Sequence, residues 1–130
     1  MRLLLDTHVA IWVSSQPSLV PPGVKKAILD PSNEIFVSSI SIFELAVKHK
    51  TGRTDSPPIG ASEAIRNFEA SGYRFLPVSP RHAAAVEGMT FHHKDPFDHL
   101  LIAQAISEPI HLVSNDAFIA LYDCPRIPWE

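Results

Sequence analysis

The chain opens with Met1-Arg2-Leu3-Leu4-Leu5-Asp6, a short apolar run that ends at an acid. Consecutive large aliphatic side chains of this kind predict a β-strand. In an open parallel sheet, ligands bind beyond the carboxyl ends of the strands, at the point where the strand order reverses. Asp6 stands at that end of the predicted strand, which makes it the first candidate for a functional residue.

Strand-like and helix-like patterns alternate along the rest of the chain. Apolar runs predict strands at residues 2–5, 34–37, 74–78 and 110–113, with a weak fifth near 126–127. Helical patterns are expected at residues 7–14, 23–29, 41–50, 61–71, 80–88, 96–107 and 117–122. Alternation of this kind implies a parallel sheet covered on both faces. We therefore expect one α/β domain over residues 1–130, a three-layer α/β/α sandwich around a mostly parallel sheet of four to five strands.

The composition limits the class of protein. The single cysteine, Cys124, excludes an internal disulfide and fits a reducing cytoplasm. The apolar run before Asp6 is too short for a signal peptide, and no stretch is long enough to span a bilayer, so we expect a cytoplasmic protein without membrane association. The net charge of −3 argues against a non-specific nucleic-acid coat, although acids gathered in one pocket are compatible with a nuclease.

A second acid, Asp116, follows the predicted strand at 110–113 after Ser114 and Asn115. Aspartate is also a common helix cap, so each acid that follows a strand has a purely structural interpretation. Taken singly, Asp116 is better interpreted as a cap. A functional interpretation is favoured for Asp6, because the neighbouring Thr7 could cap the helix instead.

Glu44 has two competing interpretations. Ser41-Ile42-Phe43-Glu44 matches a capping box, in which Glu44 would bond back to the amide of the capping serine. However, Ile40 and Val47 share its face of the predicted helix, which places Glu44 towards the sheet. A carboxylate held away from water needs a partner, and a cation is one.

The segment before the helix at 96–107 contains two acids with different roles. Asp95 followed by Pro96 is typical of a helix cap and first helical residue, so Asp95 receives at most a supporting role. Asp98 lies in the first turn, where the helix dipole favours an anion. Leu101 and Ile102 lie three and four residues later, which places Asp98 on the buried stripe and favours a metal ligand.

Together, Asp6, Glu44, Asp98 and Asp116 predict a carboxylate cluster at the strand ends, against the alternative of four unrelated caps and surface acids. Carboxylates so close would repel one another and raise their own pKa values. A hard divalent cation removes that conflict, and oxygen ligands select Mg²⁺ or Mn²⁺. The implied chemistry is phosphodiester hydrolysis by a metal-activated water, with these four acids as catalytic and metal-binding residues.

Four segments resemble the motifs of PIN domains, especially the VapC-type toxins of bacterial toxin–antitoxin pairs. They are residues 3–8 with Trp12, then 37–48, 95–105 and 112–116, and they occur in the family's order over essentially the full chain. The resemblance implies a PIN fold, Mg²⁺- or Mn²⁺-dependent cleavage of RNA, inhibition by a cognate antitoxin and homodimerisation. It also implies that Thr7 and Ser114 are polar residues supporting the acids.

Contacts with RNA phosphate are hypothesised for five basic residues, which are Lys48, Lys50, Arg53, Arg81 and Lys94. Other functions stay open at this point: a PIN nuclease or phosphatase acting on another substrate, DNA included, or a non-catalytic PIN-like interaction module. His92 and His93 invite a zinc site, but no Cys or His at matching spacing supports one. The aromatic residues Trp12, Phe43, Phe97 and Phe118 are expected to fill the core.

Overall fold

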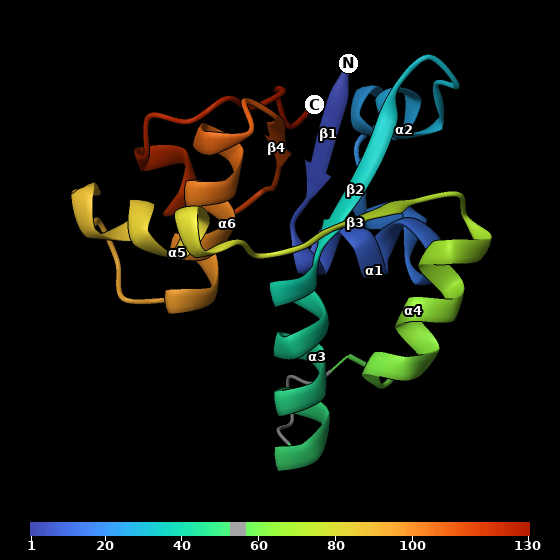
Figure 1. Ribbon diagram of the computed structural model, residues 1–130. Coiled ribbons are helices and arrows are strands. Elements are labelled where there is room, and N and C mark those ends of the chain that lie inside the picture. Colours follow the sequence, from blue (N-terminus) through green and yellow to red (C-terminus); the bar gives the residue numbers. More distant parts are fainter. Residues whose placement is uncertain (53–56) are drawn as a thin grey trace.

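The computed structural model describes residues 1–52 and 57–130, and these form a parallel sheet flanked by helices (Figure 1). The strands are β1 (Arg2–Leu5), β2 (Glu34–Ser38), β3 (Arg74–Leu76) and β4 (His111–Val113). They pair in the order β3-β2-β1-β4, with all three pairings parallel. The predicted weak strand near 126–127 is reduced to a single parallel bridge between Leu112 and Arg126. The predicted fold class is confirmed.

Six α-helices and three short 3-10 helices connect these strands in the described part of the chain. The α-helices are α1 (Thr7–Ser15), α2 (Pro22–Leu29), α3 (Ser39–Thr51), α4 (Ala61–Ala70), α5 (Pro80–Ala85) and α6 (Pro96–Ser107). The 3-10 helices are η1 (Pro17–Leu19), η2 (Val86–Gly88) and η3 (Ile119–Leu121). The helix expected at 117–122 is therefore only a 3-10 turn, and the one expected at 80–88 divides into α5 and η2.

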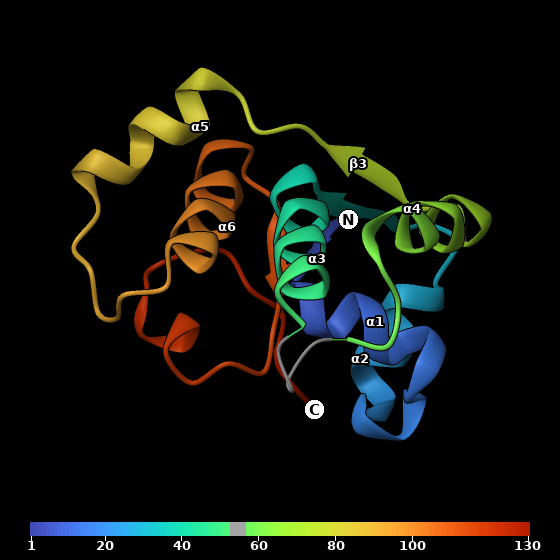
Figure 2. The ribbon, with the colours of Figure 1, turned by 90° about the horizontal axis from the view of Figure 1, so that it is seen from below.

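The buried side chains form two clusters, one on each face of the sheet. Leu3 and Leu5 of β1 belong to the cluster covered by α1, α2 and α4, whereas Leu4 belongs to the cluster covered by α6 and η3. Successive residues of a strand point to opposite faces, so the unbroken apolar run of β1 is explained by burial on both sides. Seen from below, α6 lies on one side of α3, and α1, α2 and α4 lie on the other (Figure 2).

Helix α3 extends the chain beyond the carboxyl end of β2, as Figure 1 shows. It begins after Ser38, whose side chain accepts the amide of Ile40, and it ends at Gly52. Gly52 has a φ of 63°, a left-handed conformation that costs glycine little and commonly ends helices. The helix packs between α4 and α6 and also touches α1, so its inward face overlies the carboxyl end of the sheet.

Two of the four aromatic residues expected in the core are exposed. Trp12 packs against the first cluster, but Phe43 and Phe118 are 57% and 53% exposed. Each is followed by the residue that takes the inward position, Glu44 and Ile119 respectively, so the aromatic side chain is turned outward. None of the described helices combines the length and apolar character needed to cross a membrane.

Replacement of Leu4 by alanine tests the double-sided burial of β1. Leu4 is fully buried, so Leu4→Ala should lower the free energy of unfolding by about 2 to 5 kcal/mol in urea denaturation. Leu29→Ala is the matched control, because Leu29 is 74% exposed and its loss should cost within about 0.5 kcal/mol. Equal losses in the two variants would contradict the assignment of Leu4 to the core.

Candidate active site

Asp6 lies where β1 and β4 separate, and both of its carboxylate oxygens are engaged. Its backbone N–H donates to the carbonyl of Val113 at 3.0 Å, and Ser114 Oγ donates to Asp6 Oδ2 at 2.6 Å. Oδ1 accepts the amide of His8 at 3.2 Å and caps α1. The expectation that Thr7 would cap the helix in its place is therefore wrong. The contact with Asp6 raises the pKa of half-exposed His8, although desolvation by burial opposes it.

Thr7 instead connects α1 to the buried side of α3. Its hydroxyl lies 2.8 Å from Ser41 Oγ and 2.9 Å from Glu44 Oε1. Thr7 has one hydroxyl proton, and a carboxylate only accepts, so Thr7 donates to Glu44 and accepts from Ser41. Thr7, the neighbour of Asp6 in sequence, thus fixes Glu44, which lies 37 residues beyond Thr7 in the chain.

Glu44 is 6% exposed, as its position on the inward face of α3 predicts. Its second oxygen, Oε2, forms an ion pair with Lys48 Nζ at 2.9 Å, one helical turn later. The capping-box interpretation is wrong, because Ser38 rather than Ser41 caps α3. Burial of the carboxylate is compensated here by a hydroxyl and an ammonium group.

Asp98 stands in the first turn of α6 with 14% of its side chain exposed. The pKa of Asp98 is raised to about 7, first by desolvation on burial and then by the carboxylates of Asp95, Asp6 and Asp116, while the hydrogen bond from His93 lowers it. Since the charges of Asp6 and Asp116 act on Asp98, acids from β1, the β4 end and α6 share one region. Their accumulated negative charge is the main electrostatic feature of the site.

Asp95 and Asp116 both accept backbone amides of residues that follow them, but only Asp95 caps a helix. Asp95 accepts the amides of Phe97 at 2.9 Å and Asp98 at 3.3 Å, as predicted for a helix cap. Asp116 Oδ1 accepts the amide of Phe118 at 2.7 Å in the turn before η3, but the N-cap of η3 is Phe118, so the expectation that Asp116 caps a helix is wrong.

Ser114 joins the two strand-end acids. Its hydroxyl donates to Asp6 and accepts the amide of Asp116 at 3.1 Å. Ser114 and Asp116 also line a cavity of about 360 Å³ beside the C-terminal segment. The acid end of β4 is therefore open to a small ligand on one side.

No three His, Cys, Asp or Glu side chains in the described residues are arranged so that they could hold a metal ion as they stand. Each predicted acid is held by protein partners instead, as described above. The donor chemistry nevertheless fits a hard divalent cation, because the donors are carboxylate oxygens and their mutual repulsion is only partly compensated. The match between these residues and a divalent cation therefore rests on the chemical type of the donor atoms and on their negative charge.

The five basic residues proposed to contact RNA have different surroundings. Lys48 lies inside the site against Glu44, with 14% of its side chain exposed. Lys50, Arg81 and Lys94 are exposed, and Arg53 lies outside the described residues. Lys94 lines a cavity of about 700 Å³, together with Phe91, His92, His93, Pro96, His99 and Val86.

His93 is a site residue that sequence reasoning missed. Its Nε2 lies 2.9 Å from Asp98 Oδ2, and its Nδ1 lies 2.8 Å from the hydroxyl of Tyr122. The sequence offers only its position five residues before Asp98, in a loop, and a loop conformation is not encoded in a simple spacing. His99 is buried and bonds to the backbone carbonyl of His93.

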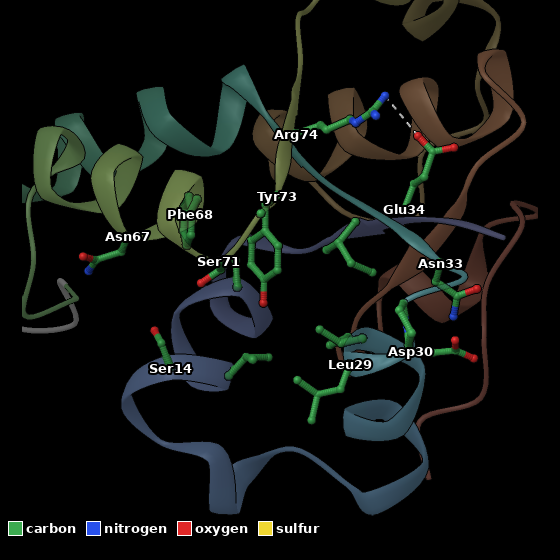
Figure 3. A pocket seen from close by; sticks show the side chains of 16 residues that line it. Ser14, Leu29, Asp30, Asn33, Glu34, Asn67, Phe68, Ser71, Tyr73 and Arg74 are labelled. Carbon is green, nitrogen blue, oxygen red and sulfur yellow. Dashed lines mark ion pairs between the residues drawn. The ribbon is translucent and has the colours of Figure 1, made fainter.

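A separate cavity of about 580 Å³ lies between α1, α2 and α4, near the amino ends of β2 and β3 (Figure 3). Tyr73 and Phe68 line it, and an ion pair between Arg74 and Glu34 of 3.2 Å crosses its edge. None of the four predicted acids lines this cavity. It therefore belongs to the end of the sheet opposite the candidate site.

Comparison with known families gives a match to the PIN domain over residues 3–123. The chain belongs to the PIN-domain family. It is 32% identical over 127 residues to Ribonuclease VapC22 of Mycobacterium tuberculosis, covering 95% of this chain and 94% of that protein. The predicted family is confirmed.

Solved structures of VapBC complexes contain chains with the same fold. A chain of VapBC2 from Rickettsia felis, bound to a promoter DNA fragment, superposes with a TM-score of 0.69 at 17% identity, over 100% of both chains. A chain of DNA-bound VapBC from Salmonella typhimurium superposes with a TM-score of 0.67 at 18% identity, over 98% of this chain and 97% of that one. A chain of VapBC-1 from nontypeable Haemophilus influenzae superposes with a TM-score of 0.64 at 17% identity, over 99% of this chain and 98% of that one.

The raised pKa of Asp98 predicts a pH-dependent cost to stability in metal-free protein. Between about pH 4 and 7 the folded chain holds a proton at Asp98 that the unfolded chain releases, so stability is lost as the pH rises through this range. Asp98→Asn removes that cost. In EDTA, the variant should gain a few degrees in Tm over wild type at pH 8 and less at pH 5. An equal gain in Tm at both pH values would contradict the raised pKa of Asp98.

Proposed function

We propose that this chain is a Mg²⁺- or Mn²⁺-dependent endoribonuclease, the toxin of a toxin–antitoxin pair. The observation that carries the proposal is that the carboxylates of Asp95, Asp6 and Asp116 all act on Asp98 and raise its pKa. These acids come from different segments of a PIN domain. Carboxylates whose mutual repulsion is only partly compensated, at the switch point of a parallel sheet, are suited to a hard cation and a phosphodiester. The similarity to Ribonuclease VapC22 supports RNA as the substrate.

Asp6, Glu44, Asp98 and Asp116 would hold the cation. When bound, a divalent ion lowers the pKa of a water ligand and stabilises charge on a phosphoryl oxygen. The protein's own contribution is orientation: Ser114 fixes Asp6, Thr7 fixes Glu44, and Asp95 holds the first turn of α6 on which Asp98 stands. Lys48 supplies a positive charge beside Glu44 from within the site.

The basic residues Lys50, Arg81 and Lys94 are proposed to guide the RNA backbone, because they are exposed and phosphate binding is dominated by cationic side chains. Arg53 keeps this role as a proposal from the sequence alone. Lys48 is better assigned to the acid cluster, since its ammonium is already paired there.

Asp6→Asn tests the proposed activity without disturbing the helix cap. Asparagine caps helices as well as aspartate does, so the fold should persist while one negative charge is lost. Cleavage of a structured RNA in Mg²⁺ should fall by about 100-fold or more, the range typical for loss of one group that stabilises transition-state charge. Asp30→Asn is the matched control, because Asp30 is a fully exposed turn cap remote from the four acids.

Digestion of RNA, single-stranded DNA and flap DNA side by side separates this function from its alternatives. We expect RNA alone to be cleaved, and cleavage to require added Mg²⁺ or Mn²⁺. Preferential cleavage of DNA would favour a PIN nuclease of another class. Equal RNA cleavage by wild type and Asp6→Asn would refute the proposed chemistry, and absence of Mn²⁺ binding in calorimetry would favour a non-catalytic interaction module.

A cognate antitoxin and a homodimer are proposed as the protein's assemblies. The VapBC complexes that share its fold, together with its PIN family, support a small partner protein. Because the acid cluster is negative, we expect a basic antitoxin side chain to reach it. Co-expression with the antitoxin should abolish RNA cleavage by the purified complex, and light scattering of the free chain should give twice the monomer mass. Full activity in a stable complex would contradict the first expectation.

A further inference from the structure

The loop before α6 and the C-terminal segment meet at His93. The His93 ring has 9% exposure and lies parallel to Phe118, with centroids 5.4 Å apart and an interplanar angle of 7°. Tyr122 and His99 contact the same ring edge-on. The imidazole is thus enclosed by rings from α6 and from around η3, which leaves little freedom to rotate.

Three hydrogen bonds through this cluster have only one consistent set of directions when Asp98 is ionised and the imidazole of His93 is neutral. The His92 backbone N–H can only donate, so the Tyr122 hydroxyl oxygen accepts it at 2.8 Å. The Asp98 carboxylate can only accept, so His93 Nε2 carries the proton between them. In neutral imidazole, Nδ1 is then an acceptor, and it receives the hydroxyl proton of Tyr122. Tyr122 therefore fixes both the orientation and the tautomer of His93.

The backbone beside His93 is held independently. His99 Nε2 lies 2.8 Å from the His93 carbonyl, and Phe91 stacks on His99 with centroids 3.8 Å apart and an angle of 6°. Through His99, helix α6 therefore fixes the loop that contains His93, and His93 in turn bonds to Asp98 on the same helix. Both the main chain and the ring of His93 are positioned before any ligand arrives.

The contact with His93 leaves one Asp98 oxygen available. His93 takes Oδ2, and Oδ1 has no hydrogen-bond partner among residues 1–52 and 57–130. Carboxylates that bind metal ions are commonly held through one oxygen by such an outer donor, which orients the other. The remaining carboxylates, Asp6 and Asp116, lie near enough to act on Asp98 electrostatically.

We propose that His93, anchored by Tyr122, is the positioning residue that orients Asp98 towards a bound divalent cation. This inference rests on the proposed function, because it requires a cation at Asp98. His93 acts through Asp98 in this role and touches neither the cation nor the RNA. Tyr122 extends the arrangement to the C-terminal segment, 29 residues from His93 in the chain.

Calorimetric titration of the full chain with Mn²⁺ tests the proposal without relying on RNA cleavage. His93→Phe keeps a ring against Phe118 but removes both hydrogen bonds, so the affinity should fall by about 10- to 100-fold. His93→Gln restores an amide donor close to the position of Nε2, and it should recover most of that loss. Far-UV circular dichroism would establish that each variant is folded.

Tyr122→Phe isolates the anchor, since it removes one hydroxyl. It should weaken Mn²⁺ binding in the same direction as His93→Phe, by several-fold. Tyr73→Phe is the matched control, because Tyr73 is the other tyrosine and lines the cavity remote from the acids. Its Mn²⁺ affinity should equal that of wild type.

The outcomes separate this inference from the proposed function. If wild type binds Mn²⁺ and Asp98→Asn does not, the metal site stands; unchanged affinity in His93→Phe would then overturn the positioning role alone. If His93→Gln binds no better than His93→Phe, the donor role of His93 is also overturned. Failure of wild type itself to bind Mn²⁺ would overturn the proposed function and this inference with it.

Discussion

The parallel pairing of β1 with β4 is the contact on which the candidate site depends. The ladder continues one residue past β1, where the Asp6 amide bonds to Val113, and this brings the Asp6 carboxylate beside Ser114. From β1 the chain continues into α1 on one face, whereas from β4 it continues into η3 on the other. Such a divergence opens the crevice in which parallel α/β sheets bind ligands. The sheet order, more than any single loop, therefore places the acids.

Much of this fold is predictable because β1 and α6 have patterns that only one structure satisfies. The apolar run of β1 was predicted with the bounds observed, since burial on both faces leaves no alternation to misinterpret. The predicted third strand extended to residue 78, but β3 ends at Leu76, because Pro77 has no N–H for the ladder. The capping-box pattern indicated Ser41 as the cap of α3, but Ser38 caps the helix and Ser41 is bonded to Thr7 of α1 instead.

The acids of the candidate site could be selected from the sequence, but their hydrogen-bond partners could not. Strand ends and helical faces are local features, and they indicated Asp6, Glu44 and Asp98. The bonds from Thr7 to Glu44 and from Tyr122 to His93 join segments distant in the chain, so no spacing predicts them. Lys48 differs, because one helical turn from Glu44 is a spacing that predicts an ion pair. Contact of Lys48 with RNA phosphate stays a prediction, beside the ion pair that the structure contains.

The acids also differ in how far neighbouring protein groups compensate their negative charge. Glu44 has an ammonium group and a hydroxyl, and Asp6 has a hydroxyl and a backbone amide. Asp98 has an imidazole on one oxygen, which lowers its pKa, but partial burial and the charges of three carboxylates outweigh this hydrogen bond and raise the pKa. A cation would therefore relieve more repulsion at Asp98 than at Glu44. Since the gain depends on where the free oxygen points, the side chain with the greatest need for a cation is also the one whose orientation is held by an aromatic cluster.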